Sequence, residues 1–157
     1  MAKGPFMEYL RARVTMSAAN NYTEVILQTP TSKTENMAML IHTIEFEPAR
    51  LIDSTPADQA EIRMQVCKDP QDDSVQISNP DQLASWKTRF HLGAITNWLT
   101  SKGTNIHKFS PPILYPKSQI YFGMGTLTFV SANLGHVKIG YTLEKVSRED
   151  FISALVE

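Results

Sequence analysis

The sequence predicts an all-β protein that folds as a single antiparallel sandwich or barrel of about eight strands, with a short C-terminal helix. Segments in which apolar and polar residues alternate recur along the chain at intervals of roughly 8 to 15 residues. Helical spacing is confined to single turns and the C-terminal segment, so the alternation of strands and helices that a parallel fold needs is missing. The 157 residues, of which 42% are hydrophobic, suffice for one core and barely for two.

Three strands are predicted in the N-terminal third. The first begins near residue 9 and is half-buried, and the second spans residues 23–29 and is closed by Pro30. The segment 37–46 begins with apolar residues on both faces, which predicts a central strand. The residues that share the apolar face of the first strand are Leu10, Ala12, Val14 and Met16.

The middle of the chain predicts a helical turn at residues 54–58 and then further strands. In residues 61–66 apolar residues alternate with Glu61, Arg63 and Gln65, which predicts a strand. A short strand at 75–77 and another half-buried strand at 86–92 follow. Residues 94–110 stay open, because helix and strand signals compete there.

The C-terminal third carries the longest strand signal. Three prolines in residues 111–116 exclude a central strand, so this segment is expected at an edge or in a rim loop. Residues 119–130 form the next strand, whose glycines predict a bend or a close approach of another backbone segment. A hairpin turn at 133–135 is expected to pair this strand with a final one at 137–146.

A short helix at residues 148–156 is predicted by the S-x-x-D capping pattern of Ser147 and Asp150. Its apolar residues Phe151, Ile152 and Leu155 have a spacing that suits either docking on the sandwich or contact with a neighbouring subunit. The sequence leaves both arrangements open.

Composition and motifs indicate no catalytic or metal chemistry. The four histidines are scattered, and no nucleophile elbow or phosphate-binding loop occurs, so we predict no enzyme activity, no metal and no cofactor. The single cysteine, Cys67, reads as a small buried residue. No run of about 18 apolar residues occurs, which predicts a cytoplasmic protein without a transmembrane segment.

Charge and aromatic residues suggest two kinds of binding. With 15 basic and 16 acidic residues the chain lacks the footprint of a free-standing nucleic-acid binder, but Lys3, Arg11 and Arg13 could bind phosphates if many copies gathered them on one surface. The charged fraction of 20%, below the roughly 25% of soluble domains, is compatible with surface covered by other subunits. Five aromatic residues are candidates for a sugar platform or for interface anchors: Trp86, Trp98, Tyr115, Tyr121 and Phe122.

The mapped strands, the proline-rich segment 111–117, and the segments 119–123 and 140–145 together resemble the single jelly-roll capsid proteins of small icosahedral viruses. The resemblance covers roughly residues 9–146. It implies an antiparallel jelly-roll β-sandwich of about eight strands over 9–146, preceded by an N-terminal arm (1–8) and followed by a C-terminal helix (147–157). Unlike many such proteins, this chain has no long basic arm.

The resemblance also implies a function. Many identical copies would self-assemble into an icosahedral shell, without catalysis, as part of a virion assembled in the host cytoplasm. The chain's main partner would be itself, with encapsidated nucleic acid as a second partner that Lys3, Arg11 and Arg13 would face. The candidate subunit-interface residues are Tyr115, Phe151, Ile152 and Leu155. A carbohydrate-binding β-sandwich module and a cupin-like enzyme are the alternative interpretations.

Overall fold

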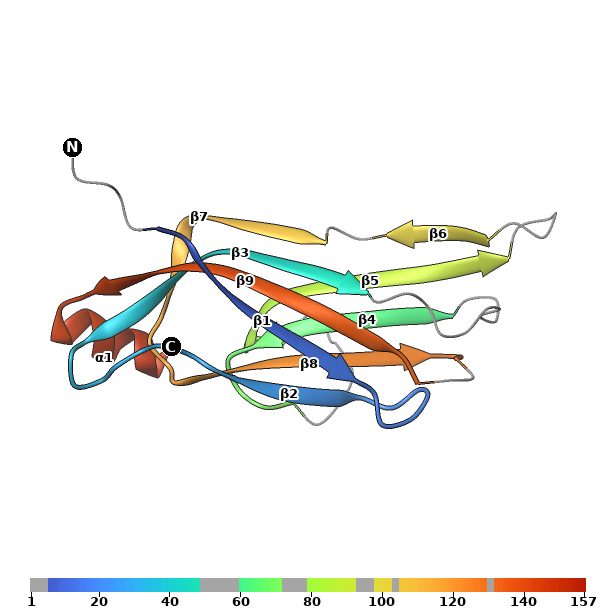
Figure 1. Cartoon of the computed structure of the whole chain (residues 1–157), viewed down its shortest axis with the longest axis horizontal. Coiled ribbons are helices and arrows are strands. Elements are labelled where there is room, and N and C mark those ends of the chain that lie inside the picture. The colour runs from blue at the N-terminus through green and yellow to red at the C-terminus, as the bar shows by residue number, and fades with distance from the viewer. Residues whose placement is uncertain (1–5, 49–59, 72–78, 93–97, 103–104, 130–131) are drawn as a thin grey trace.

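Two β-sheets packed face to face form an elongated sandwich, with one helix at its end (Figure 1). The computed structural model describes residues 6–48, 60–71, 79–92, 98–102, 105–129 and 132–157. Within these residues there are nine strands and one helix. They are β1 (Glu8–Thr15), β2 (Thr23–Gln28), β3 (Met37–Pro48), β4 (Glu61–Cys67), β5 (Gln82–Leu92), β6 (Trp98–Lys102), β7 (Ile106–Tyr115), β8 (Gln119–Leu127), β9 (Leu134–Lys145) and α1 (Arg148–Val156).

The strand order is that of a jelly roll. One sheet has the order β1-β9-β3-β7 and the other β2-β8-β4-β5-β6, and the neighbouring strands are antiparallel. Only β4, β5 and β6 follow one another within a sheet, whereas every other consecutive pair of strands lies in opposite sheets. This wrapping of the chain around two sheets confirms the predicted fold class. The extra strand β6 falls in the segment that the sequence pattern left open.

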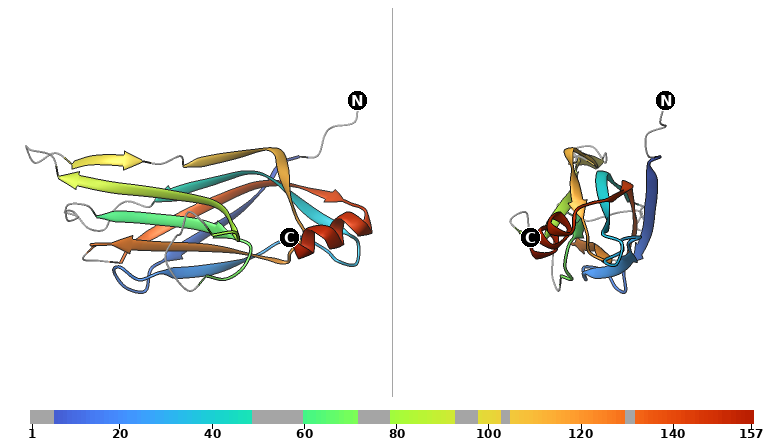
Figure 2. Two further views of the ribbon diagram at one scale, coloured as in Figure 1. Left: turned by 180° about the vertical axis from the view of Figure 1, so that it is seen from behind. Right: turned by 90° about the vertical axis from the view of Figure 1, so that its left-hand side faces the viewer.

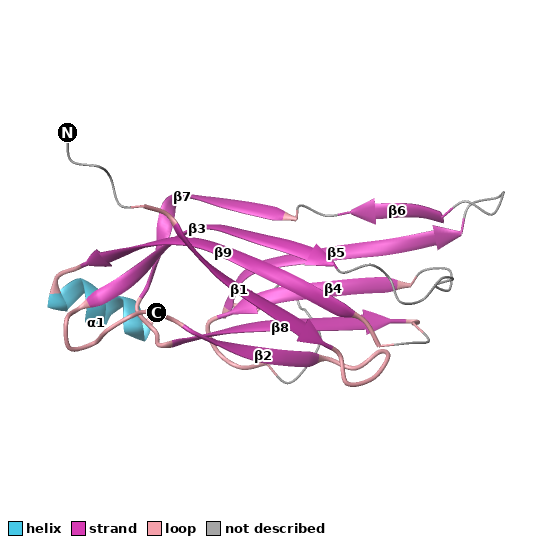
Figure 3. Ribbon diagram, viewed as in Figure 1, coloured by secondary structure: helices cyan, strands magenta, loops and turns pink. Residues whose placement is uncertain are grey.

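The core fills the space between the two sheets, whose strands are drawn in magenta in Figure 3. Val14 of β1, Phe46 of β3 and Ile139 of β9 are fully or almost fully buried in it, opposite Met64 of β4 and Phe122 of β8. The alternation read from the first strand is therefore confirmed, since Val14 points inward while its neighbours are exposed.

Both predictions about the β3–β7 pair are confirmed. β3 is a central strand that pairs with β9 on one side and with β7 on the other. β7 is an edge strand, and its register against β3 jumps from Ile41–Ile113 to Thr43–Lys108. Pro111 and the residue after it lie inside this interruption, where the ladder does not need their missing N–H groups.

The predicted hairpin between the last two strands is wrong. β8 lies between β2 and β4, whereas β9 lies between β1 and β3 in the other sheet. Gly135, at the start of β9, packs so closely under the opposite sheet that a Cβ there would be 2.7 Å from the sulfur of Met64 and 3.0 Å from that of Met124. The turn therefore carries the chain across the sandwich instead of folding it back within one sheet.

β4 is almost entirely buried on both faces, although its apolar and polar residues alternate. Gln65 is 1% exposed because Tyr22 covers it, and the Gln65 amide donates a 2.9 Å hydrogen bond to the Tyr22 hydroxyl. The Tyr22 ring lies directly over Gly123 of β8, where any Cβ would collide with it. The group that approaches this glycine is therefore a side chain, and not the backbone segment that the glycine pattern predicted.

Helix α1 spans Arg148–Val156 as predicted, and the Asp150 amide donates to the Ser147 hydroxyl at 3.0 Å. It lies at the end of the sandwich where β1 begins (Figure 2). The predicted turn at 54–58, the predicted strand at 75–77 and most of the predicted N-terminal arm lie outside the described residues.

Candidate functional site

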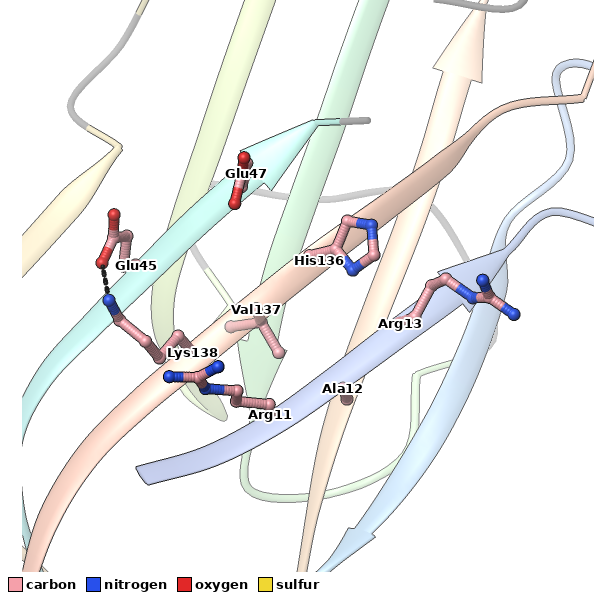
Figure 4. Close-up of a pocket in the computed structure, with 8 residues that line it drawn as sticks. All are labelled: Arg11, Ala12, Arg13, Glu45, Glu47, His136, Val137 and Lys138. Atoms are coloured by element: carbon pink, nitrogen blue, oxygen red, sulfur yellow. Dashed lines mark ion pairs between the residues drawn. The ribbon is translucent and has the colours of Figure 1, made fainter. Parts of the chain in front are cut away.

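The outward face of the four-stranded sheet carries six ionisable side chains in two rows across three strands (Figure 4). Register places Arg11 of β1 beside Lys138 of β9, which in turn lies beside Glu45 of β3. The second row lies two residues away on each strand and contains Arg13, His136 and Glu47. Together these residues line a shallow hollow of about 470 Å³.

The period of the strands explains this arrangement. Because successive side chains of a strand point to opposite faces, burying Val14, Ile44 and Ile139 in the core sends the intervening polar residues outward. Three strands with the same alternation therefore stack their polar residues in rows.

Cations outnumber carboxylates in this hollow by one. The Lys138 ammonium forms a 2.8 Å ion pair with Glu45 and lies 5.5 Å from the centroid of the Tyr9 ring. Arg11 and Arg13 are exposed and form no ion pair or hydrogen bond with any described residue. The exposed Arg11 guanidinium beside Lys138, with Arg13 in the next row, is suited to binding phosphate oxygens.

The structure thus gathers two of the three predicted phosphate-facing residues, Arg11 and Arg13, into one hollow. Lys3 lies outside the described residues. Sequence reasoning missed Lys138 and His136, because their place beside the arginines depends on the pairing of β1 with β9. That register becomes visible only once the two strands are known to be neighbours.

Two of the four predicted interface residues are core residues instead. Tyr115 is 1% exposed, and its hydroxyl donates to the Gln119 carbonyl at 2.7 Å, so it braces the turn into β8. Phe151 is 3% exposed and docks α1 on its own sandwich. Ile152, which is 50% exposed, and the half-buried Leu155 remain candidates for contact with another subunit.

Among the described side chains, the aromatic residues suggested for sugar binding form no exposed platform. Trp86 is 3% exposed, and Phe122 and Tyr115 are buried in the core as well. The half-buried Tyr121 donates to the Gln119 side chain at 3.1 Å, and the side chain of Trp98 lies outside those described. Buried rings offer no flat surface to a carbohydrate.

Nucleophilic and metal chemistry find no geometric support in the described part of the chain. Burial raises the pKa of the Cys67 thiol to about 12, which keeps it protonated and unreactive. Within the described residues no three potential metal ligands come together, and no helix is long and apolar enough to cross a membrane.

A second charged cluster lies on the outward face of the five-stranded sheet. The Glu61 carboxylate of β4, 2% exposed, forms ion pairs with Arg63, Lys87 and Arg89. Burial alone would raise the pKa of Glu61, but hydrogen bonds from Arg89, Arg63 and Lys87 outweigh burial and hold its pKa below the ordinary value. The alternating charges of β4 and β5 are visible in the sequence, but their convergence depends on the register between the two strands.

The fold is a jelly-roll sandwich, an architecture that viral capsid proteins also have. Two solved structures that share it are of VP1 from Trichodysplasia spinulosa-associated polyomavirus. One, in complex with sialylated precision glycooligomers, is 8% identical with a TM-score of 0.50, covering 94% of this chain and 98% of that one. The other, VP1 alone, is also 8% identical with a TM-score of 0.50, covering 93% and 98%.

At this identity the comparison shows a shared fold, and the architectural resemblance to viral capsid jelly rolls is confirmed at that level. No protein-family model matches the sequence, and no curated protein matches it.

Proposed function

We propose that this protein is the repeating subunit of a closed shell, a viral capsid, and that it has no catalytic role. The observation that carries the proposal is the jelly-roll topology over almost the whole chain, shared with VP1 of a polyomavirus. A rigid sandwich with strand-connecting segments at both ends suits side-by-side packing of identical copies. The protein would accordingly belong to a virion, assembled in the host cytoplasm.

Helix α1 supplies a contact surface for such packing. Ile152 is 50% exposed and Val156 84% exposed, and they lie one turn apart on the side of the helix away from Phe151. Exposed apolar side chains at this spacing are typical of a helix face that another surface covers. We infer that Ile152, with Leu155 beside it, contacts a neighbouring copy.

The hollow on the four-stranded sheet is the proposed contact with encapsidated nucleic acid. A single hollow with Arg11 and Arg13 binds a polyanion weakly, but many copies on one shell surface would add their contributions.

Assembly tests the proposal directly. The purified protein should form particles of tens of subunits in negative-stain electron microscopy within a scan of salt and pH. Ile152→Asp should reduce particle yield without unfolding the subunit, whereas Ser153→Asp, an exposed neighbour on the same helix, should leave it unchanged. A protein that stays monomeric or trimeric throughout the scan would overturn the proposal.

A further inference from the structure

Three cations converge on one buried carboxylate on the outward face of the five-stranded sheet. The Arg89 guanidinium donates to Glu61 Oε2 from Nε at 2.9 Å and from Nη2 at 2.7 Å, and Lys87 Nζ lies 3.0 Å from Oε1. Arg63 Nε donates to the same Oε1. Because all three cations contact the two oxygens of one carboxylate, their charged groups lie close to one another.

The sheet fixes this convergence. Glu61 pairs across the strands with Arg89, and Arg63 pairs with Lys87, so the four side chains occupy two adjacent rows of β4 and β5. Glu61 itself is 2% exposed, which makes it the anchor beneath the cations and not a competitor for ligands at the surface. The free-energy cost of removing the Glu61 carboxylate from water is offset by the three cations that surround it.

The cluster has a surplus of two positive charges. No other described carboxylate forms an ion pair with Arg63, Lys87 or Arg89. Only some of the N–H groups of each cation contact Glu61, and the side chains of Lys87 and Arg89 are 42% and 43% exposed. Their remaining N–H groups are thus available to an anion that approaches from solvent.

We propose that Arg63, Lys87 and Arg89, held together by Glu61, form a binding site for a phosphate group. A tetrahedral oxyanion presents several acceptor oxygens at once and matches the forked donors of two arginines beside a lysine. The hollow on the four-stranded sheet has a surplus of only one cation, so this second face has the stronger local excess. The site belongs to the single subunit and holds or fails independently of shell assembly.

Inorganic phosphate is the probe for the test, and its binding to the purified full chain is followed by phosphorus NMR at constant ionic strength. The parent protein should show saturable broadening of the phosphate resonance. Lys87→Gln and Arg89→Gln should each raise the Kd about twofold to fivefold, the size typical of one solvent-exposed charge contact. Lys108→Gln, which removes an exposed lysine from the other sheet, is the matched control and should leave the Kd unchanged.

Two results would overturn the inference: binding that does not saturate, or Lys87→Gln and Arg89→Gln affinities equal to that of the parent while circular dichroism shows a folded sandwich. A short oligothymidylate then separates the two sources of phosphate. If it displaces phosphate and binds more weakly to the Lys87→Gln variant, the site takes a nucleic-acid backbone. If phosphate binds and the oligonucleotide does not compete, the site takes the free anion, and both results support a phosphate site.

Discussion

Replacing Glu61 by glutamine should destabilise the subunit by about 2 kcal/mol at about pH 7. The substitution keeps the shape of the side chain and removes the negative charge with which Arg63, Lys87 and Arg89 form ion pairs. Breaking a fully buried ion pair costs roughly 3–5 kcal/mol. The three cations here are partly exposed, and exposed pairs contribute roughly 0.2–1 kcal/mol each, which brings the expected loss down to about 2 kcal/mol.

The loss should also depend on pH, with a sign set by the lowered pKa of Glu61. Since the folded-state pKa lies below the ordinary value of 4.5, the carboxylate's contribution is complete above about pH 4.5 and disappears as the pH falls through the folded-state pKa. The difference in unfolding free energy between parent and Glu61→Gln should therefore shrink in acid.

Urea unfolding followed by the fluorescence of the buried Trp86 measures both effects. Glu47→Gln is the control, because Glu47 is exposed and has no ion pair within the described residues, and it should change stability by less than about 0.5 kcal/mol. A loss no larger than that of the control, or one that stays constant as the pH falls, would refute the reasoning.

Two further substitutions test the packing of the five-stranded sheet. Gly123→Ala should lower the free energy of unfolding in urea by about 1–3 kcal/mol, because the new methyl group collides with the Tyr22 ring. Gly125→Ala should lower it much less, because its Cβ would lie an ordinary 3.6 Å from that ring. Equal losses would show that Tyr22 does not cover Gly123. Thr88→Val should raise the thermal midpoint, with a gain of about 1 kcal/mol, because the buried Thr88 hydroxyl has no hydrogen-bond partner among the described residues. Thr142→Val should lower the thermal midpoint, since the Thr142 hydroxyl shares a 2.9 Å hydrogen bond with the His42 ring. A lower thermal midpoint for Thr88→Val would contradict the argument.

Strands and the terminal helix could be predicted because their signals are local. Alternation located the start of β1 to within a residue, and the capping pattern at Ser147 located the start of α1. The pairing of β8 with β9 was predicted wrongly because a short turn with Asn133 and a glycine is equally suited to crossing between sheets. Gly135 is needed there to let β9 pass beneath the opposite sheet, which is a tertiary requirement that a single sequence does not reveal.

The same difference between local and long-range signals explains which site residues could be predicted from the sequence. Exposure of Arg11 and Arg13 follows from alternation alone, whereas their joining with Lys138 depends on strand neighbours. Tyr115 was predicted at an interface as an aromatic anchor in a segment expected at an edge or in a rim loop. Its hydroxyl instead lies within hydrogen-bond distance of two backbone carbonyls, and its ring is part of the core. Register and long-range packing decided both outcomes.

The native mass of the purified protein tests the central claim most directly. Mass photometry or sedimentation velocity over a range of salt and pH should detect a discrete species with many times the 17.7 kDa mass of the single chain, as expected for a closed shell. A protein that is monomeric or trimeric under every condition, with its sandwich intact by circular dichroism, would contradict the account.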